Sequence, residues 1–272
     1  GVYMVVIGLG TAGANIARQF EKWPQYRIVT LEAGKEIPLQ ETVEDYEKSC
    51  PRLKRKIKKI DGEVWFIVAG SAKVAGSTLA ILEQIKQHKI NVVHISADPM
   101  FMSAQGRRRE KVSVGVLQQY ARCGLLNAIY LISNKHVLDI LDGVPFSEAN
   151  DKINETLASM IHYFNIYQNT EPLMGSKIEP KGISRIRTFG IVDLKKSEEK
   201  SFFSLDNITE TCYIYNIKKT EKSNDKKIDK IKTMMEVKET SCKTSFAMYT
   251  TEYEQSFCHA IQMTHYIQQE EQ

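Results

Sequence analysis

Residues 2–20 read VYMVVIGLGTAGANIARQF, and this stretch decides the fold class. The apolar run 2–7 predicts a buried strand, and the periodic run 12–20 predicts a helix. Between them stands the glycine turn Gly8-Leu9-Gly10-Thr11-Ala12-Gly13, whose backbone N–H groups could approach a phosphate at the start of the helix. The alternative is a glycine turn that serves only the packing of helix against strand. Either way, a strand–turn–helix unit opens an α/β fold.

Strands and helices continue to alternate along the first 165 residues. Further strands are predicted at 26–31, 64–68, 90–96 and 128–133, and helices at 78–87, 108–123 and 146–164. This order indicates a doubly wound, mostly parallel, Rossmann-like sheet with helices on both faces.

The pattern changes after the turn signals of residues 165–182. Strands are predicted at 186–194, 201–205, 212–217 and 244–250, and helices at 228–237 and 253–269. We therefore expect a smaller α+β domain, joined to the first domain by a long central helix. The predicted boundaries are 1–145, 146–165 for the connecting helix, 166–251 for the smaller domain and 252–272 for a C-terminal helix.

Composition fits a globular protein of one large or two small domains. Of 272 residues, 42% are hydrophobic and 26% charged, with a net charge of +4, which excludes a wholly disordered chain. No apolar run reaches the roughly 20 residues that span a bilayer, and the opening run has no basic flank. The five cysteines form no C-x-x-C pair, and the six histidines have no metal-ligand spacing. We expect a cytoplasmic protein with reduced thiols and no metal site formed by side chains.

Two further features have competing interpretations. Glu32 follows the second predicted strand, where a Rossmann oxidoreductase would hold the ribose of NAD. The basic runs 52–59 and 218–227 are either solvated surfaces or contacts to an acidic partner. Because no aromatic residue interleaves either run, we do not expect nucleic acid as a partner.

Three later segments, taken with the glycine turn, carry a family resemblance. They are Gly106-Arg107-Arg108-Arg109, the strand 129–134 that ends in Asn134, and Phe146-Ser147-Glu148-Ala149-Asn150-Asp151. In this order the chain resembles the tubulin/FtsZ superfamily, and its FtsZ branch most closely. The resemblance covers residues 2–165 well and is weaker over 183–250.

The resemblance implies a GTP or GDP site, with Mg²⁺ as a possible companion. The implied phosphate contacts are Gly8, Gly10, Thr11, Ala12 and Gly13, with Gly70, Ser71, Gly76 and Ser77 in the family's signature loop. The implied ribose and base contacts are Asn15, Gln105, Arg109, Asn134, Phe146, Asn150 and Asp151. A carboxylate suits this role, because it can accept both guanine N–H donors, which adenine does not offer.

The signature loop itself departs from the family pattern. The family's loop is of the form G-G-G-T-G-[ST]-G, whereas here Ala69–Thr78 keeps only Gly70 and Gly76. Side chains on Ala72, Val74 and Ala75 restrict the backbone and crowd a phosphate. We expect altered nucleotide contacts here, with Lys73 directed to solvent.

The hydrolytic loop departs as well. The family carries an Asn-x-Asp-x-x-Asp type pattern after the long helix, which acts on the nucleotide of the next subunit. Residues 165–175 contain no Asp, and Glu171 is the only candidate catalytic carboxylate.

The expected function follows from these features. It is a divergent guanine-nucleotide-binding protein that assembles head-to-tail into filaments, with weak or absent GTP hydrolysis and a cytoskeletal role. A filament-binding adaptor is a possible partner. The alternative is a degenerate member that has lost nucleotide binding or polymerisation and acts as a structural or regulatory protein.

Overall fold

A computed structural model describes residues 4–57, 60–176, 182–219, 225–251 and 256–269. The chain forms two compact units, which we describe separately. The first comprises Gly1–Ser159 with Gln269–Gln272, and the second Met160–Gln268. The division falls inside the long helix α7 (Ala149–Gln168), which contains most of the predicted connecting segment.

The first unit is built on a parallel sheet. Its strands lie in the order β2-β1-β3-β4-β5, and each hydrogen-bonded pair is parallel. Their bounds are β1 (Met4–Leu9), β2 (Tyr26–Leu31), β3 (Val64–Ala69), β4 (Ile90–Ser96) and β5 (Ala128–Ser133). Nearly every residue of β1 and of β3 to β5 is buried, as expected of strands covered on both faces.

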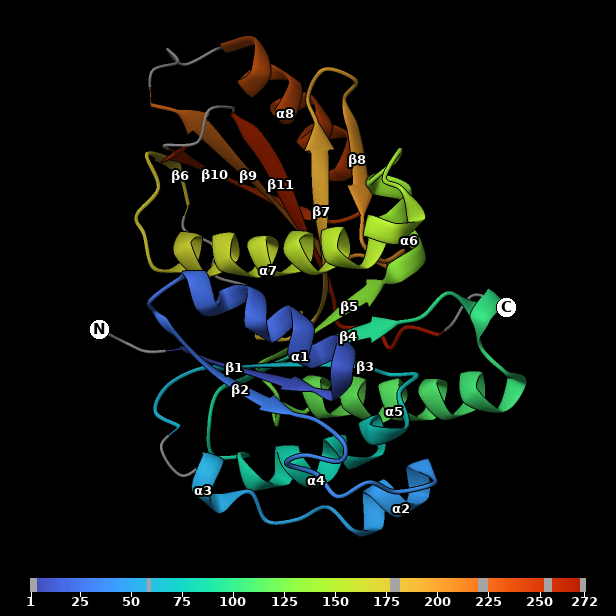
Figure 1. The fold of residues 1–272 in the computed structure, drawn as a ribbon. Coiled ribbons are helices and arrows are strands. Elements are labelled where there is room, and N and C mark those ends of the chain that lie inside the picture. Colours follow the sequence, from blue (N-terminus) through green and yellow to red (C-terminus); the bar gives the residue numbers. More distant parts are fainter. Residues whose placement is uncertain (1–3, 58–59, 177–181, 220–224, 252–255, 270–272) are drawn as a thin grey trace. The chain divides into compact units, whose positions relative to one another are not determined.

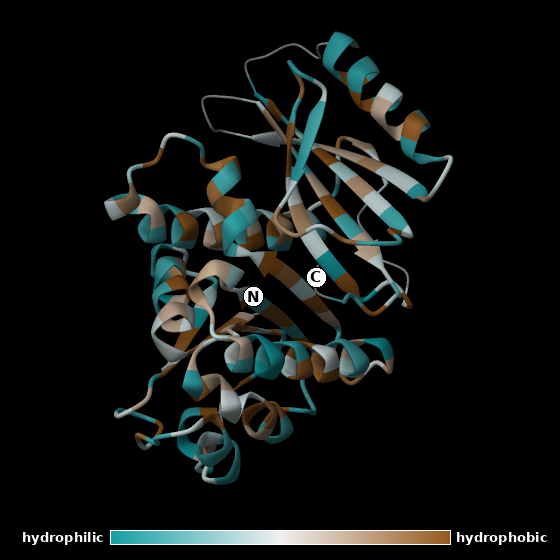
Figure 2. Ribbon diagram, turned by 90° about the vertical axis from the view of Figure 1, so that its right-hand side faces the viewer, coloured by the Kyte–Doolittle hydropathy of each residue, from teal (hydrophilic) through white to brown (hydrophobic). Residues whose placement is uncertain are grey.

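Helices cover both faces of this sheet, as predicted (Figure 1). The α-helices are α1 (Gly10–Arg18), α2 (Val43–Lys48), α3 (Lys54–Ile57), α4 (Thr78–Gln84), α5 (Ala104–Arg122) and α6 (Asn134–Ile140). Short 3₁₀ helices add η1 (Gln19–Lys22), η2 (Lys73–Ser77), η3 (Pro99–Phe101) and η4 (Phe146–Glu148). The hydropathy colouring places the apolar residues in the sheet between the helices (Figure 2). At its centre the fully buried Trp65 and Tyr130 lie with ring centroids 5.1 Å apart.

The second unit is a mixed sheet with the last residues of α7 and one further described α-helix. Its strands lie in the order β7-β11-β9-β10-β6, with β8 paired to β7. Their bounds are β6 (Met174–Gly175), β7 (Ile186–Asp193), β8 (Glu198–Ser201), β9 (Glu210–Lys218), β10 (Lys243–Thr251) and β11 (Phe257–Thr264), and the helix is α8 (Asp225–Lys238). Ile228 and Ile231 of α8 join Tyr213 and Tyr215 of β9 in a buried cluster.

The predicted C-terminal helix at 252–272 is wrong over the described residues. Phe257–Thr264 is the strand β11, antiparallel to both β7 and β9. Because β11 is central and almost wholly buried, its sequence does not alternate, and its apolar residues mimicked a helical spacing. Residues 252–255 and 270–272, also within the predicted helix, lie outside the described residues.

Two other boundaries also differ from the prediction. The strand expected at 201–205 is β8 at Glu198–Ser201, since a polar hairpin has no apolar periodicity to mark it. The helix expected from residue 146 begins at Ala149, after a 3₁₀ turn that follows Pro145. Among the described residues, no helix combines the length and apolar character needed to cross a bilayer.

Candidate nucleotide site in the first unit

Three of the predicted nucleotide contacts follow parallel strands that end at a common edge of the sheet. Leu9, the last residue of β1, lies opposite Val68 of β3. Further along the sheet Ser96 of β4 lies opposite Ser133 of β5. The residues that follow these strands include Gly10, Gly70 and Asn134, three of the predicted contacts. This is the edge at which open α/β sheets bind ligands.

Helix α1 presents an open N-terminus at this edge. Its N-cap residue is Leu9, and no side chain caps it, whereas Thr42, Ser103 and Ser133 cap α2, α5 and α6. Gly10 has φ of +77°, a conformation that glycine adopts without strain. The exposed Thr11 and Ala12 follow it. The first N–H groups of α1 can therefore receive an anion.

The other two glycines of the turn are required by packing. A Cβ at Gly8 would overlap the carbonyl group of Gly13, and one at Gly13 would overlap the carbonyl oxygen of Ile67 in β3. Both glycines are buried. The packing interpretation of the glycine turn therefore accounts for Gly8 and Gly13, whereas Gly10, which is also buried, is required by its positive φ.

The signature-loop region packs against helix α2 of the same unit. A Cβ at Gly76 would overlap the carbonyl oxygen of Val43 in α2, and the buried Ser77 hydroxyl donates to the carbonyl oxygen of Tyr46 at 3.0 Å. These two predicted phosphate contacts thus hold η2 against α2. Ser71 and Lys73 are exposed, as expected for Lys73.

Two further contacts of this loop could not be seen in the sequence. A Cβ at Gly10 would lie 2.9 Å from Cγ1 of Val74, so the loop packs directly over the glycine turn. Beneath the loop, a Cβ at Gly70 would overlap the ring of His94 and come within 2.9 Å of Oε1 of Glu110. Burial lowers the pKa of His94 to about 4, which leaves its ring neutral at neutral pH.

The predicted ribose and base contacts are mostly exposed. Phe146 is 91% exposed on η4, and Asn150 and Asp151 are exposed in the first turn of α7. In contrast, the Oδ1 atom of Asn134 is buried and has no hydrogen-bond partner among the described residues. An exposed ring and an unsatisfied buried amide oxygen are both features that a ligand could complete.

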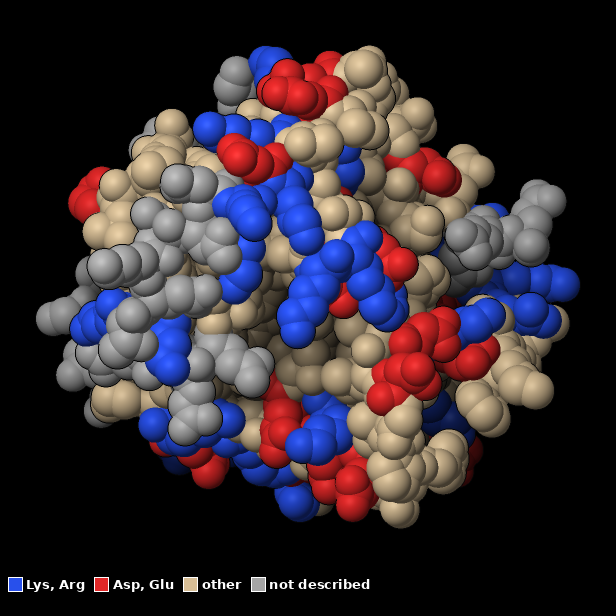
Figure 3. Space-filling view, turned by 90° about the horizontal axis from the view of Figure 1, so that it is seen from above, with Lys and Arg blue, Asp and Glu red and all other residues tan. Residues whose placement is uncertain are grey.

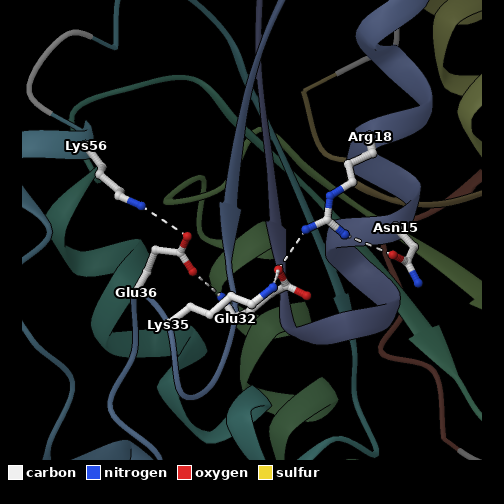
Figure 4. A network of polar contacts seen from close by, with 6 residues as sticks. All are labelled: Asn15, Arg18, Glu32, Lys35, Glu36 and Lys56. Atoms are coloured by element: carbon white, nitrogen blue, oxygen red, sulfur yellow. Dashed lines mark hydrogen bonds and ion pairs between the residues drawn. The ribbon is translucent and has the colours of Figure 1, made fainter.

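Two predicted contacts already have partners from within the first unit. Arg109 forms an ion pair with Glu44 of α2 at 3.5 Å, while Gln105 is exposed beside it on α5. Asn15 accepts a hydrogen bond from Arg18 at 3.0 Å (Figure 4). Sequence reasoning missed Glu44, because α2 was not predicted.

Glu32, the residue favoured by the oxidoreductase alternative, is engaged by cations of its own unit. Arg18 donates to its Oε2 at 2.7 Å and Lys35 at 3.3 Å, and Glu36 pairs with Lys56 nearby (Figure 4). The hydrogen bond from Arg18 lowers the pKa of Glu32. Both cations bind Oε2, so this carboxylate is already engaged within its own unit.

Glu171 lies in the second unit, on the exposed segment between α7 and β6. The same unit carries the described part of the second basic run. Figure 3 shows Lys and Arg side chains gathered on its face, which carries α8 and the β7–β8 turn. There, Lys230 donates to the carbonyl oxygen of Leu194 at 2.9 Å. Among the described residues, no group of three or more His, Cys, Asp or Glu side chains could hold a metal ion.

The parallel sheet, followed along the chain by a mixed-sheet unit, defines a two-unit α/β protein. No protein-family model matches the chain, and no curated protein matches it. Solved structures do match over nearly its whole length, and they give the chain the tubulin/FtsZ fold, as its motifs predicted.

Three of these structures show how similar the chain is to solved proteins in fold and in sequence. The TubZ protofilament of Bacillus thuringiensis serovar israelensis in its GTPγS form has a TM-score of 0.74 at 13% identity, covering 97% of this chain and 87% of that one. The empty FtsZ dimer of M. jannaschii has a TM-score of 0.69 at 12% identity, covering 97% and 88%. The GTPγS-bound CetZ2 protofilament of Haloferax volcanii has a TM-score of 0.69 at 10% identity, covering 96% and 92%.

Proposed function

We propose that this chain binds a guanine nucleotide in its first unit and assembles head-to-tail into filaments. Its role would be cytoskeletal, in division, positioning or segregation, in the cytoplasm and with a filament-binding adaptor as a further partner. The observation that supports this best is the gathering of the open α1 N-terminus, Asn134 and the 91%-exposed Phe146 in one unit. The similar TubZ and CetZ2 protofilaments support the assembly.

Each part of the nucleotide has a group to receive it. The first N–H groups of α1, at Gly10, Thr11 and Ala12, would bind phosphate oxygens. Phe146 would stack on the base, and the carboxylate of Asp151 would accept its two N–H donors. GTP supplies the transferable phosphoryl group, and any Mg²⁺ would be held largely by its phosphates.

The chain's own loops favour weak or absent hydrolysis. The signature-loop region is held against α2 by Gly76 and Ser77, and Val74 covers Gly10. Fewer backbone donors are then free to close round the phosphates. The segment after α7 offers Glu171 as its sole carboxylate.

A degenerate, nucleotide-free protein is the second candidate. The packing of Val74 over Gly10 favours it, because an apolar side chain stands where a phosphate would approach the turn. An NAD-dependent oxidoreductase is not favoured, since Glu32 is already paired with Arg18 and Lys35.

The first test is the identity of the nucleotide that is released when the purified protein is denatured. Titrations of GTP and ATP follow, on the wild type, Asp151→Ala and the control Asp139→Ala, an exposed aspartate of α6. We expect Asp151→Ala to weaken GTP binding by about 1–3 kcal/mol, because the guanine donors lose their acceptor. ATP binding and the control should be unchanged. Equal affinity of the wild type for GTP and ATP would refute guanine recognition, and no binding of either would favour the degenerate candidate.

A further inference from the structure

The side chain of Arg18, at the end of α1, bridges two residues of the first unit. Its Nη1 donates to Oδ1 of Asn15 at 3.0 Å, and its Nη2 donates to Oε2 of Glu32 at 2.7 Å (Figure 4). Asn15 is a predicted base contact, and Glu32 is the residue that the oxidoreductase alternative favours. Arg18 itself belongs to neither motif, yet it connects the two.

The guanidinium of Arg18 is held in place from the side of Glu32. Only 12% of the Glu32 side chain is exposed, and its carboxylate also accepts a bond from Lys35 at 3.3 Å. The backbone N–H of Glu32 in turn donates to the carboxylate of Glu36 at 3.0 Å. A carboxylate fixed in this way holds the planar fork of an arginine in one orientation. Arg18 therefore presents its Nη1 to Asn15 from a fixed position.

This contact decides which end of the Asn15 amide faces outward. A guanidinium carries only hydrogen-bond donors, so only the amide oxygen can face it. The two ends of an asparagine amide have nearly the same shape, and the hydrogen-bond network alone distinguishes them. In Figure 4 the amide nitrogen of Asn15 points away from Arg18. Because Asn15 is exposed, this nitrogen offers N–H donors to a ligand and no acceptor.

Donors at such a position distinguish guanine from adenine. Guanine carries the acceptor O6 at the place where adenine carries an amino group, which is a donor. An amide nitrogen that faces this atom gains a hydrogen bond from guanine, but it meets another donor in adenine. An amide that could turn over would present its oxygen to adenine and lose the distinction. The orientation of the Asn15 amide therefore bears on the choice of base.

We propose that Arg18 is a positioning residue for base selection, which holds Asn15 with its N–H donors toward O6 of the guanine. This role rests on the proposed function and concerns the same site. Asp151 would accept the N–H donors of that base, so the two side chains divide its recognition between one donor and one acceptor. The ion pair of Arg18 with Glu32 then serves the nucleotide without touching it.

The test is calorimetric titration of GTP, ITP and ATP onto the wild type, Arg18→Met, Asn15→Ala and the double variant. ITP keeps O6 and lacks only the 2-amino group of guanine. We expect Arg18→Met to weaken GTP and ITP by the same factor, about three- to tenfold, and not to weaken ATP. In the Asn15→Ala background it should have no further effect on GTP, because Arg18 acts through Asn15.

A matched control and a variant of the same shape complete the experiment. Arg27→Met removes an arginine of β2 that donates to the carbonyl oxygen of Lys56 at 3.1 Å, and it should leave all three affinities unchanged. Asn15→Asp keeps an acceptor for Arg18 but turns a second oxygen toward the base. It should lower the ratio of GTP to ATP affinity more than Asn15→Ala does, since this oxygen repels O6 and accepts from the amino group of adenine. Urea unfolding checks that each variant is folded.

The outcomes separate the role of Arg18 from the proposed function. If the wild type does not bind GTP, or binds GTP and ATP equally, the guanine site fails and the role of Arg18 fails with it. If the wild type prefers GTP and Arg18→Met keeps that preference, the guanine site stands and the role is wrong. An equal loss of GTP, ITP and ATP would mean that the cation acts on the phosphates. A loss that persists in the Asn15→Ala background would mean that Arg18 does not act through Asn15, and either result overturns the role.

Discussion

Gly10 enters α1 with φ of +77° and lies under the side chain of Val74. Alanine here must adopt the left-handed region, at about 1 kcal/mol, and must also displace Val74. Gly34 has φ of +81° but no atom within 4 Å of an added Cβ, so it isolates the backbone effect. We expect Gly34→Ala to destabilise the first unit by about 1 kcal/mol and Gly10→Ala by clearly more. Urea unfolding followed by the fluorescence of Trp23 and Trp65 measures both, and equal losses would mean that Val74 yields freely.

Glu32 should make the stability of the first unit depend on pH, and the direction of that dependence follows from its pKa. The hydrogen bond from Arg18 lowers the pKa of Glu32 below its unfolded value, which is about 4.3. Its contribution to stability is therefore present above the unfolded pKa and is lost as the pH falls through the folded one. Because Arg18 is 40% exposed, we expect Glu32→Gln to cost only about 0.5–1 kcal/mol at pH 7.

As the pH falls below the unfolded pKa that difference should shrink, and it should disappear only below the lowered folded pKa, where Glu32 of the wild type is protonated as well. Unfolding free energies between pH 3 and pH 7 test this, with Glu21→Gln, an exposed glutamate of η1, as the control. A deficit of Glu32→Gln that stays constant across this range would contradict the charge-based explanation.

Among the elements of the second unit, β8 pairs with β7 and also contacts three other elements through a single carboxylate. Glu199 accepts hydrogen bonds from Tyr213 at 2.7 Å, Gln262 at 2.8 Å and Lys238 at 2.5 Å. These partners come from β9, β11 and α8, and only 8% of the Glu199 side chain is exposed. Glu199→Gln should therefore destabilise this region by about 1–3 kcal/mol, since the half-buried Lys238 loses its counter-charge and the buried hydrogen bonds lose their charged acceptor.

Amide hydrogen exchange at β9 and β11 measures that loss locally. The matched control is Glu83→Gln, which removes an ion pair to Lys86 whose two side chains are 68% and 63% exposed. This control should change stability by less than about 0.5 kcal/mol. Equal effects of the two substitutions would contradict the role of burial.

The elements that could be predicted are those whose structure is specified by their own residues and the turns next to them. The strands 26–31, 90–96 and 128–133 have the predicted bounds, because short apolar runs between turn residues specify buried strands. The strand β11 could not be recognised, since its burial depends on β7 and β9, which precede it in the chain.

The same distinction applies to the candidate site. The left-handed turn at Gly10 follows from its own sequence. The partners of Gly76, Ser77 and Arg109 all lie on α2, a six-residue helix with no apolar periodicity. Tertiary contacts thus decide which of the predicted contacts remain available for a nucleotide.

For the whole molecule, the two units divide the proposed chemistry between them. The described candidate contacts for the nucleotide lie within residues 1–159, whereas Glu171 belongs to the second unit. Under the proposed assembly, Glu171 of one copy would act on the nucleotide of the next. Hydrolysis would then depend on assembly, and the two can be measured together.

We expect assembly that depends on nucleotide, with slow or undetectable release of phosphate. The loop over Gly10 offers few free donors, and Glu171 is followed by Pro172 and by a segment fixed to β10, which restricts how its carboxylate can be aimed. Loss of a well-placed general base typically lowers the rate by about 10²–10⁴-fold. Phosphate release against protein concentration, recorded alongside light scattering, tests this. Fast turnover that rises cooperatively with concentration, is abolished by Glu171→Gln and is unaffected by the control Glu198→Gln would make Glu171 the catalytic residue and overturn this expectation.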